Sequence, residues 1–197
     1  VTWNTDPSWD NRETEGILAN ITFREGAKVL ADRGLSLDMM QAFPQMPEIA
    51  DFAKAVPELT IILNHIGGLS RSGIYANKDD EVIPVWREGI AAVAACPNVV
   101  VKLGGLGMPR IGFGWHAREV PIGSQELAEA MSPWLTYCIE QFGPDRCMFE
   151  SNFPPDKMSF SYNVMYNAFK RLCQGYSESE RAAMLHDTAT RVYGIKV

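Results

Sequence analysis

Side chains that can perform acid–base chemistry follow a short apolar run late in the sequence. Residues 147–149 (Cys-Met-Phe) have the composition of a buried parallel strand, and Glu150 and Asn152 come directly after them, separated by a serine. A Pro-Pro pair at 154–155 prevents the strand from continuing. A carboxylate, a hydroxyl and an amide are therefore presented at the carboxyl end of a strand, where they can exchange protons with a substrate or orient water.

The same pattern recurs after three earlier apolar runs. The polar residues that follow these runs are Asp38 after residues 35–37, His65 after residues 61–63 and Lys102 after residues 99–101. Strands that alternate with helical segments form a parallel sheet, and the carboxyl ends of its strands meet at one edge. An edge lined by such side chains is typical of the active-site face of an enzyme.

Three of these segments carry a family resemblance. LNHIGG (63–68), NVVVKLGGLGM (98–108) and RCMFESNFPPDK (146–157) resemble the amidohydrolase-2 family of metal-dependent hydrolases. That family includes sugar lactonases, 2-pyrone-4,6-dicarboxylate hydrolase and some decarboxylases. The resemblance implies an α/β fold, the C-terminal half of a (β/α)8 TIM barrel, because a whole barrel has roughly 250 residues. We expect residues 1–197 to form a single domain, with an N-terminal part missing before Val1-Thr-Trp3, which resembles the tail of a strand.

Apolar periodicity and capping signals predict the elements between these motifs. Strands are expected at residues 35–39, 60–63, 99–103 and 147–149, and helices at 21–33, 47–56, 82–95, 124–142 and 161–173. A capping box at Ser177–Glu180 should begin a last helix. The strands should be parallel neighbours in sequence order, with the helices on one outer face.

His65 is the strongest single candidate for chemistry. An imidazole at the end of a strand, directly before a Gly-Gly turn, could bind a metal or donate a hydrogen bond to a substrate carbonyl. The structural alternative is a core histidine satisfied by backbone groups. The resemblance matches His65 to the histidine that ends barrel strand 6 in the family.

The metal ligands expected of such a barrel are incomplete in this sequence. The histidine pair (HxH) that opens the family's barrels does not occur, and Asp38 ends strand 5, where many relatives of the wider superfamily have a histidine. Since a tightly held ion needs three or more good ligands, we expect no bound metal in this chain alone. The intact protein could hold at most one divalent ion, Zn or Mn, at His65 together with ligands from the missing part.

Asn152 departs from the family, in which most sequences have an aspartate at the end of strand 8. An amide cannot accept a proton at neutral pH, so Asn152 could orient water or substrate, or serve only in a turn. Glu150 lies on the same side of the strand by two-residue alternation and could supply the missing carboxylate, as could Asp156. The alternative for Glu150 is an ion pair with Lys102 inside the barrel.

Asp38 and Lys102 are expected beside these groups. Asp38 is either an inward-facing carboxylate or a loop N-cap, and Lys102 either forms an ion pair or binds a substrate carboxylate. We expect Lys102 to converge with His65, Glu150 and Asn152 on one pocket. The side chains of His65 and Asn152 should then lie within roughly 10 Å of each other.

A glycine-rich loop spans residues 104–123 and is long enough to be functional. His116 or Arg118 could contribute to a lid over an anionic substrate, or both could face solvent. Gln45, in an earlier loop, could also reach the substrate, although a surface role is the alternative.

Composition limits the partners. The chain has 197 residues, 46% of them hydrophobic, and a net charge of −6, which disfavours nucleic acids and anionic membranes. No apolar run approaches the roughly 20 residues of a membrane span. The four cysteines are widely spaced, which indicates buried reduced thiols in a cytoplasmic protein. A small-molecule substrate, carboxylated according to this interpretation, is the expected partner, and a homo-oligomer is compatible with the sequence.

The resemblance implies hydrolysis of a small anionic lactone or a related C–O bond. In that mechanism, water is activated by a carboxylate, by a divalent ion or by both. Two alternatives stay open: a decarboxylase-type lyase of the same superfamily, and a catalytically inactive binding protein.

Overall fold

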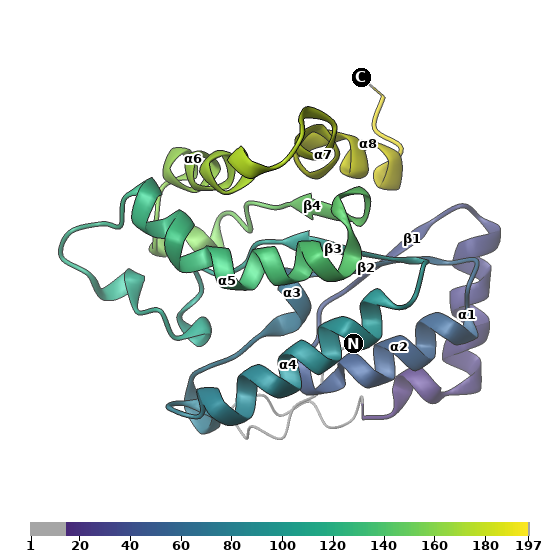
Figure 1. Cartoon of the computed structure of the whole chain (residues 1–197). Coiled ribbons are helices and arrows are strands. Elements are labelled where there is room, and N and C mark those ends of the chain that lie inside the picture. Colours follow the sequence, from purple (N-terminus) through teal and green to yellow (C-terminus); the bar gives the residue numbers. More distant parts are fainter. Residues whose placement is uncertain (1–14, 197) are drawn as a thin grey trace.

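A four-stranded parallel sheet lies at the centre of the chain (Figure 1). The structure, a computed structural model, describes residues 15–196. The strands, adjacent in sequence order, are β1 (Ser36–Met39), β2 (Thr60–Leu63), β3 (Val99–Leu103) and β4 (Cys147–Phe149). All three pairings are parallel, so the four carboxyl ends meet at one edge. The predicted strand order is confirmed, and the expected strand at residues 1–3 lies outside the described residues.

The helices follow the predicted ranges to within a few residues. They are α1 (Ile21–Asp32), α2 (Met46–Ala55), α4 (Asp79–Ala94), α5 (Ser124–Phe142), α6 (Tyr162–Leu172), α7 (Glu178–Ala182) and α8 (Thr188–Tyr193). The one-turn α3 (His65–Gly68) was not predicted. The Asn20 side chain caps α1, and Ser161 caps α6. The predicted capping box between Ser177 and Glu180 is confirmed.

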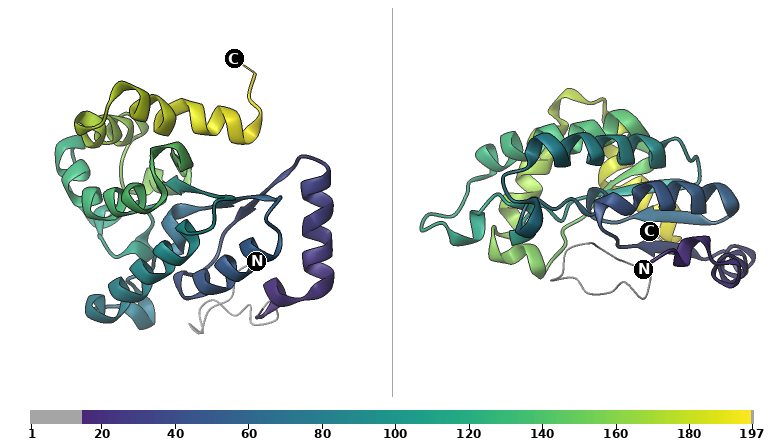
Figure 2. Two further views of the ribbon diagram at one scale, coloured as in Figure 1. Left: turned by 45° about the vertical axis from the view of Figure 1, so that its right-hand side comes forward. Right: turned by 90° about the horizontal axis from the view of Figure 1, so that it is seen from below.

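Alternate residues of the strands build the main core. Ile61, Leu63, Val99 and Val101 are fully buried and belong to one cluster with side chains of α2, α4 and α5. In Figure 1, α2 and α4 lie below the strands and α5 crosses in front of them, and Figure 2 shows the same layer from two further sides. Burial of one strand face against helices is the arrangement of the outer layer of an α/β barrel.

The opposite face of the sheet is also covered. Ile62, Val100 and Met148 form a second buried cluster, against which Ala189 and Val192 of α8 pack. The expectation that helices would lie on one face only is therefore wrong for α8. The physical reason is that this apolar row must be removed from water, and among the described residues the short last helix covers it.

The prediction of buried, unpaired cysteines is confirmed within residues 15–196. Cys96, Cys138, Cys147 and Cys173 are all buried and free of disulfides, as predicted. Among the described helices none is long and apolar enough to cross a membrane.

Asn98 ties the start of β3 to the turn between α2 and β2. Its side-chain amide donates to the carbonyls of Ala53, Val56 and Leu59 at 3.0–3.2 Å.

Asn98→Ala should lower the free energy of unfolding by about 2 kcal/mol, because buried carbonyls lose their partner. Urea denaturation measures the loss, and the exposed Asn163→Ala in α6 serves as the control. Equal stability of the two variants would contradict this role.

Candidate active site

The chain makes a left-handed turn directly after β2. His65 and Ile66 have φ values of 52° and 47°, and Gly67 and Gly68 continue the turn with positive φ. A left-handed conformation costs roughly 1–2 kcal/mol for a residue with a side chain, most of all for a β-branched one. Trp86 holds the turn by donating from Nε1 to the Ile66 carbonyl at 2.8 Å. Strain of this kind, held in place by neighbours, is characteristic of functional sites.

This turn brings His65 to Glu150, at the end of β4. The Nδ1 atom of His65 lies 2.5 Å from Oε1 of Glu150, and the backbone N–H of His65 donates to the same oxygen at 3.1 Å. The side chains are only 13% and 14% exposed. When Nδ1–H donates to the carboxylate, Nε2 of a neutral imidazole carries the free lone pair. The pair therefore presents a base at the carboxyl edge of the sheet.

Glycines of the loop after β3 pack against the same side chains. An added Cβ would be blocked at each of three positions: at Gly104 by Cγ of Glu150 at 2.5 Å, at Gly105 by the His65 ring at 2.8 Å, and at Gly107 by Cγ of Asp156 at 2.8 Å. The backbone of this loop thus forms one wall of the site, and no side chain fits between it and the polar groups.

Asp156 is the second carboxylate of the site. It is 1% exposed, its Oδ1 accepts from Nδ2 of Asn152 at 2.7 Å, and its Oδ2 accepts from Gly107 N at 3.1 Å. Burial raises the pKa of Asp156 to about 6, against the opposing effect of these two hydrogen bonds. Asn152 adopts a left-handed φ of 47°, and its amide group is directed to Asp156.

Asp38 and Lys102 form a second pair near the carboxyl ends of β1 and β3, on the face that α8 covers. Lys102 Nζ lies 2.5 Å from Asp38 Oδ1, and the Tyr193 hydroxyl donates to both oxygens of Asp38 at 3.0 and 3.2 Å. Burial lowers the pKa of Lys102, but the hydrogen bonds to Asp38 and Tyr193 outweigh it and raise the pKa overall. The suggested ion pair between Glu150 and Lys102 is therefore not formed, because each has a nearer partner.

The remaining predicted site residues lie elsewhere. Gln45 is buried at the start of α2, where its Oε1 accepts from Ala42 N at 3.2 Å. His116 is exposed on a short 3-10 helix, and Arg118 pairs with Glu126 at 2.7 Å. The structure thus groups His65, Glu150, Asn152 and Asp156. Gln45, His116 and Arg118 lie outside this group.

Comparison with known proteins places the chain in a family. The sequence profile of the amidohydrolase family (Amidohydro_2) matches residues 1–195. The chain belongs to the amidohydrolase family. It is 38% identical over 173 residues to protein y4mH of Sinorhizobium fredii, covering 88% of the chain and 52% of the relative. It is 25% identical over 187 residues to L-fucono-1,5-lactonase of Burkholderia multivorans, covering 94% and 60%.

Solved amidohydrolase structures share the fold. A Burkholderia multivorans amidohydrolase with bound HEPES superposes with a TM-score of 0.81 at 24% identity, over 95% of this chain and 62% of that one. The same protein with bound zinc gives a TM-score of 0.80 at 24% identity, over the same shares. The chain thus spans less than two thirds of these relatives, which agrees with the partial barrel expected from the sequence.

The described part of this amidohydrolase does not by itself make a metal site. Among residues 15–196 there is no group of three or more His, Cys, Asp and Glu side chains that could hold an ion. His65 offers one imidazole nitrogen, Nε2, because Nδ1 is bonded to Glu150. A divalent ion at His65 would therefore need ligands from outside the described residues.

Sequence reasoning gave too little weight to Asp156 and missed Tyr193. Asp156 lies beyond the Pro-Pro pair, and only its burial against Gly107 shows that it belongs to the site. Tyr193 approaches Asp38 from the last helix, 155 residues away in sequence, and no local pattern signals that contact.

Gly105→Ala tests the fit between the loop and the imidazole. The added methyl would lie 2.8 Å from the His65 ring, at a φ of 74° that already disfavours alanine. Gly114→Ala is the matched control, since its φ is 72° and nothing lies within 4 Å of its added Cβ. Gly105→Ala should lower the free energy of unfolding in urea by about 1–3 kcal/mol more than Gly114→Ala does. It should also shift the resonances of the His65 ring in NMR spectra. Equal effects of the two variants would argue against a tight wall.

Asp156 should make stability depend on pH. Its pKa rises from 3.8 to about 6 on folding, so its contribution to the free energy of unfolding is full below pH 3.8 and is lost as the pH rises through about 6. The free energy of unfolding should fall by about 3 kcal/mol over this range. Asp156→Asn should remove this fall when unfolding is measured by urea at several pH values. The exposed Asp32→Asn should keep it, and a wild-type pH profile in Asp156→Asn would refute the assignment.

Proposed function

We propose that the protein hydrolyses a small carboxylated lactone or a related C–O bond, with the pair of His65 and Glu150 as its proton-accepting centre. The observation that carries this proposal is the double contact of Glu150 Oε1 with the backbone N–H and Nδ1 of His65. The contact of Glu150 with the backbone N–H holds the carboxylate in place, and its contact with Nδ1 fixes the orientation and the tautomer of the imidazole. The family match and the lactonase relative support a hydrolase of this class.

The proposed reaction uses Nε2 of His65 as a general base. Nε2 accepts a proton from water, and the water oxygen forms a bond to the lactone carbonyl carbon. The Glu150 carboxylate stabilises the positive charge that develops on the ring. Collapse of the tetrahedral intermediate breaks the bond to the ring oxygen, which takes the proton back from Nε2. The product is an open-chain hydroxy acid.

Asn152 and Asp156 serve in this proposal as a fixed polar wall. Asn152 keeps its carbonyl oxygen as an acceptor, because its amide group donates to Asp156. That oxygen can orient the attacking water. Gln45, His116 and Arg118 have less support as substrate ligands, since one caps a helix, one faces solvent and one is paired with Glu126.

Lys102 is the candidate for binding the substrate carboxylate. Its charge is maintained by Asp38, and its side chain is 20% exposed, so a carboxylate can approach it. Asp38 then has the role of holding the lysine in place, and the proposed substrate is a small anion.

Glu150→Gln tests the proposed base. The amide cannot stabilise the imidazolium, so kcat for hydrolysis of a carboxylated lactone should fall by about 100-fold or more in the purified protein. Glu126→Gln, which removes an exposed acid that is also ion-paired, should leave kcat unchanged.

Product analysis distinguishes the alternatives in the same assay. Release of a hydroxy acid supports hydrolysis, and release of CO2 would indicate a decarboxylase instead. Binding of substrate without turnover would favour an inactive binding protein. Full activity of Glu150→Gln would remove Glu150 from the mechanism and direct attention to Asp38 or Asp156.

A further inference from the structure

A cavity of about 710 Å³ opens between the loop after β3 and the segment after β4. Both segments follow carboxyl ends of strands, so the cavity lies at the same edge of the sheet as the candidate active site. Most of its wall is apolar, and the residues that matter here are Ile122, Phe153, Met158, Phe160, Tyr162 and Lys157. Its volume is within the range of sites for small organic ligands, about 300–1,000 Å³.

Ring contacts give this cavity a fixed shape. Phe153 and Tyr162 meet edge to face with ring centroids 5.4 Å apart, and Phe160 meets Trp115 at 5.9 Å. Ser159 Oγ donates to the Gly107 carbonyl at 2.5 Å, which joins the two sides of the cavity. Met158 and Tyr162 are 55% and 50% exposed, so apolar surface is available to a ligand.

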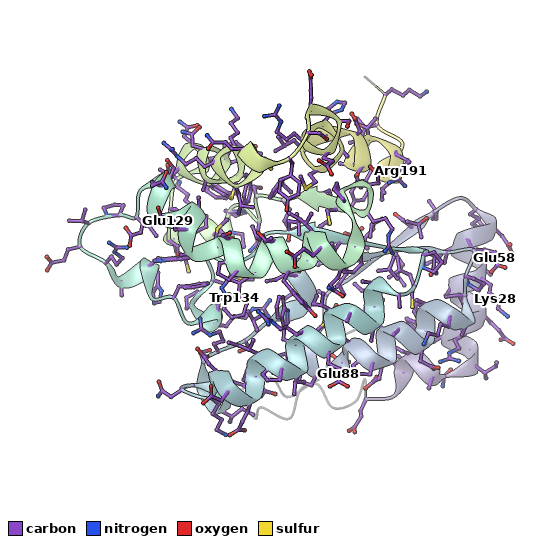
Figure 3. The ribbon with its side chains drawn as sticks, viewed as in Figure 1. Lys28, Glu58, Glu88, Glu129, Trp134 and Arg191 are labelled. Atoms are coloured by element: carbon purple, nitrogen blue, oxygen red, sulfur yellow. The ribbon has the colours of Figure 1, made fainter. Side chains whose placement is uncertain are left out.

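The charge of the cavity distinguishes it from three others in the molecule. Each of those combines a cation with a carboxylate: Lys28 with Asp32 and Glu58, Lys78 with Glu81, and Arg171 with Glu129. Figure 3 shows Lys28 beside Glu58 at one end of the molecule and Glu129 on α5 at the other. The cavity at Lys157 has no acidic residue in its lining, and Lys157 has no ion pair among the described residues.

The segment that carries Lys157 separates this cavity from the active site. Asp156 and Lys157 are neighbours in the 3-10 helix Pro155–Met158. Asp156 is 1% exposed and bonded to Asn152, whereas Lys157 is exposed and lines the cavity. A ligand in the cavity would therefore contact the outer side of the segment whose inner side holds the second carboxylate.

We propose that this cavity is a second binding site, which takes an apolar carboxylate of the arylalkanoate type. The hydrocarbon part packs on Phe153, Met158 and Tyr162, and the carboxylate pairs with Lys157. An unpaired ammonium group at the edge of an apolar cavity selects an anion over a neutral or cationic ligand of the same shape. The inference goes beyond the proposed hydrolysis and does not depend on it.

Calorimetric titration with phenylbutyrate tests the site directly. Lys157→Ala should weaken binding by about tenfold or more, because one charge-assisted contact is lost. Lys170→Ala, which removes an exposed lysine from α6, should bind as the wild type does. Phenylbutylamine, which has the opposite charge, should bind more weakly than phenylbutyrate.

A third variant distinguishes this cavity from the active site. His65→Ala should bind phenylbutyrate as tightly as the wild type, and NMR shifts on titration should appear at the ring of Tyr162. Equal binding by Lys157→Ala and the wild type would overturn the proposal, as would binding that is lost in His65→Ala but kept in Lys157→Ala. Because no turnover is measured, failure of the proposed hydrolysis would leave this result unaffected.

Discussion

The hydrogen-bonded pair of His65 and Glu150 is the constraint to which the surrounding backbone is fitted. The imidazole reaches the carboxylate only because the chain turns left-handed at His65 and Ile66, which ordinary side chains avoid. The loop after β3 must then approach so closely that Gly104 and Gly105 have no room for a Cβ. The strained backbone after β2 and the glycines after β3 are thus both consequences of the contact between His65 and Glu150. Stability lost at these positions is recovered by the buried strands beneath them.

The strands and most helices could be predicted from the sequence because the signals that define them are local. Apolar runs end where polar residues begin, and Ser177 with Glu180 marks a helix start that the structure has. The face covered by α8 could not be predicted this way. Ala189 and Val192 form too short an apolar pattern to say which surface they bury, since that depends on Ile62, Val100 and Met148 far earlier in the chain.

Some members of the candidate site could be predicted from the sequence, but the pairing of their side chains could not. Sequence placed His65, Lys102 and Glu150 at strand ends, because the carboxyl edge of a parallel sheet gathers them. Which acid pairs with which base depends on side-chain directions across strands. Glu150 had Lys102 as a plausible partner, and the structure gives it His65. Asp156 was weighed only as a substitute for Asn152, whereas the two are bonded to each other.

The pairing of Lys102 with Asp38 has a consequence for the chemistry of Glu150. Lys102 is in register with Met148, two residues before Glu150, so without Asp38 its ammonium group would attract the Glu150 carboxylate. A lysine-bound Glu150 would no longer fix the tautomer of His65. Asp38, held by the Tyr193 hydroxyl, is the partner of Lys102 and leaves Glu150 to the imidazole. The last helix therefore supports the base indirectly, because its Tyr193 holds the carboxylate that pairs with Lys102.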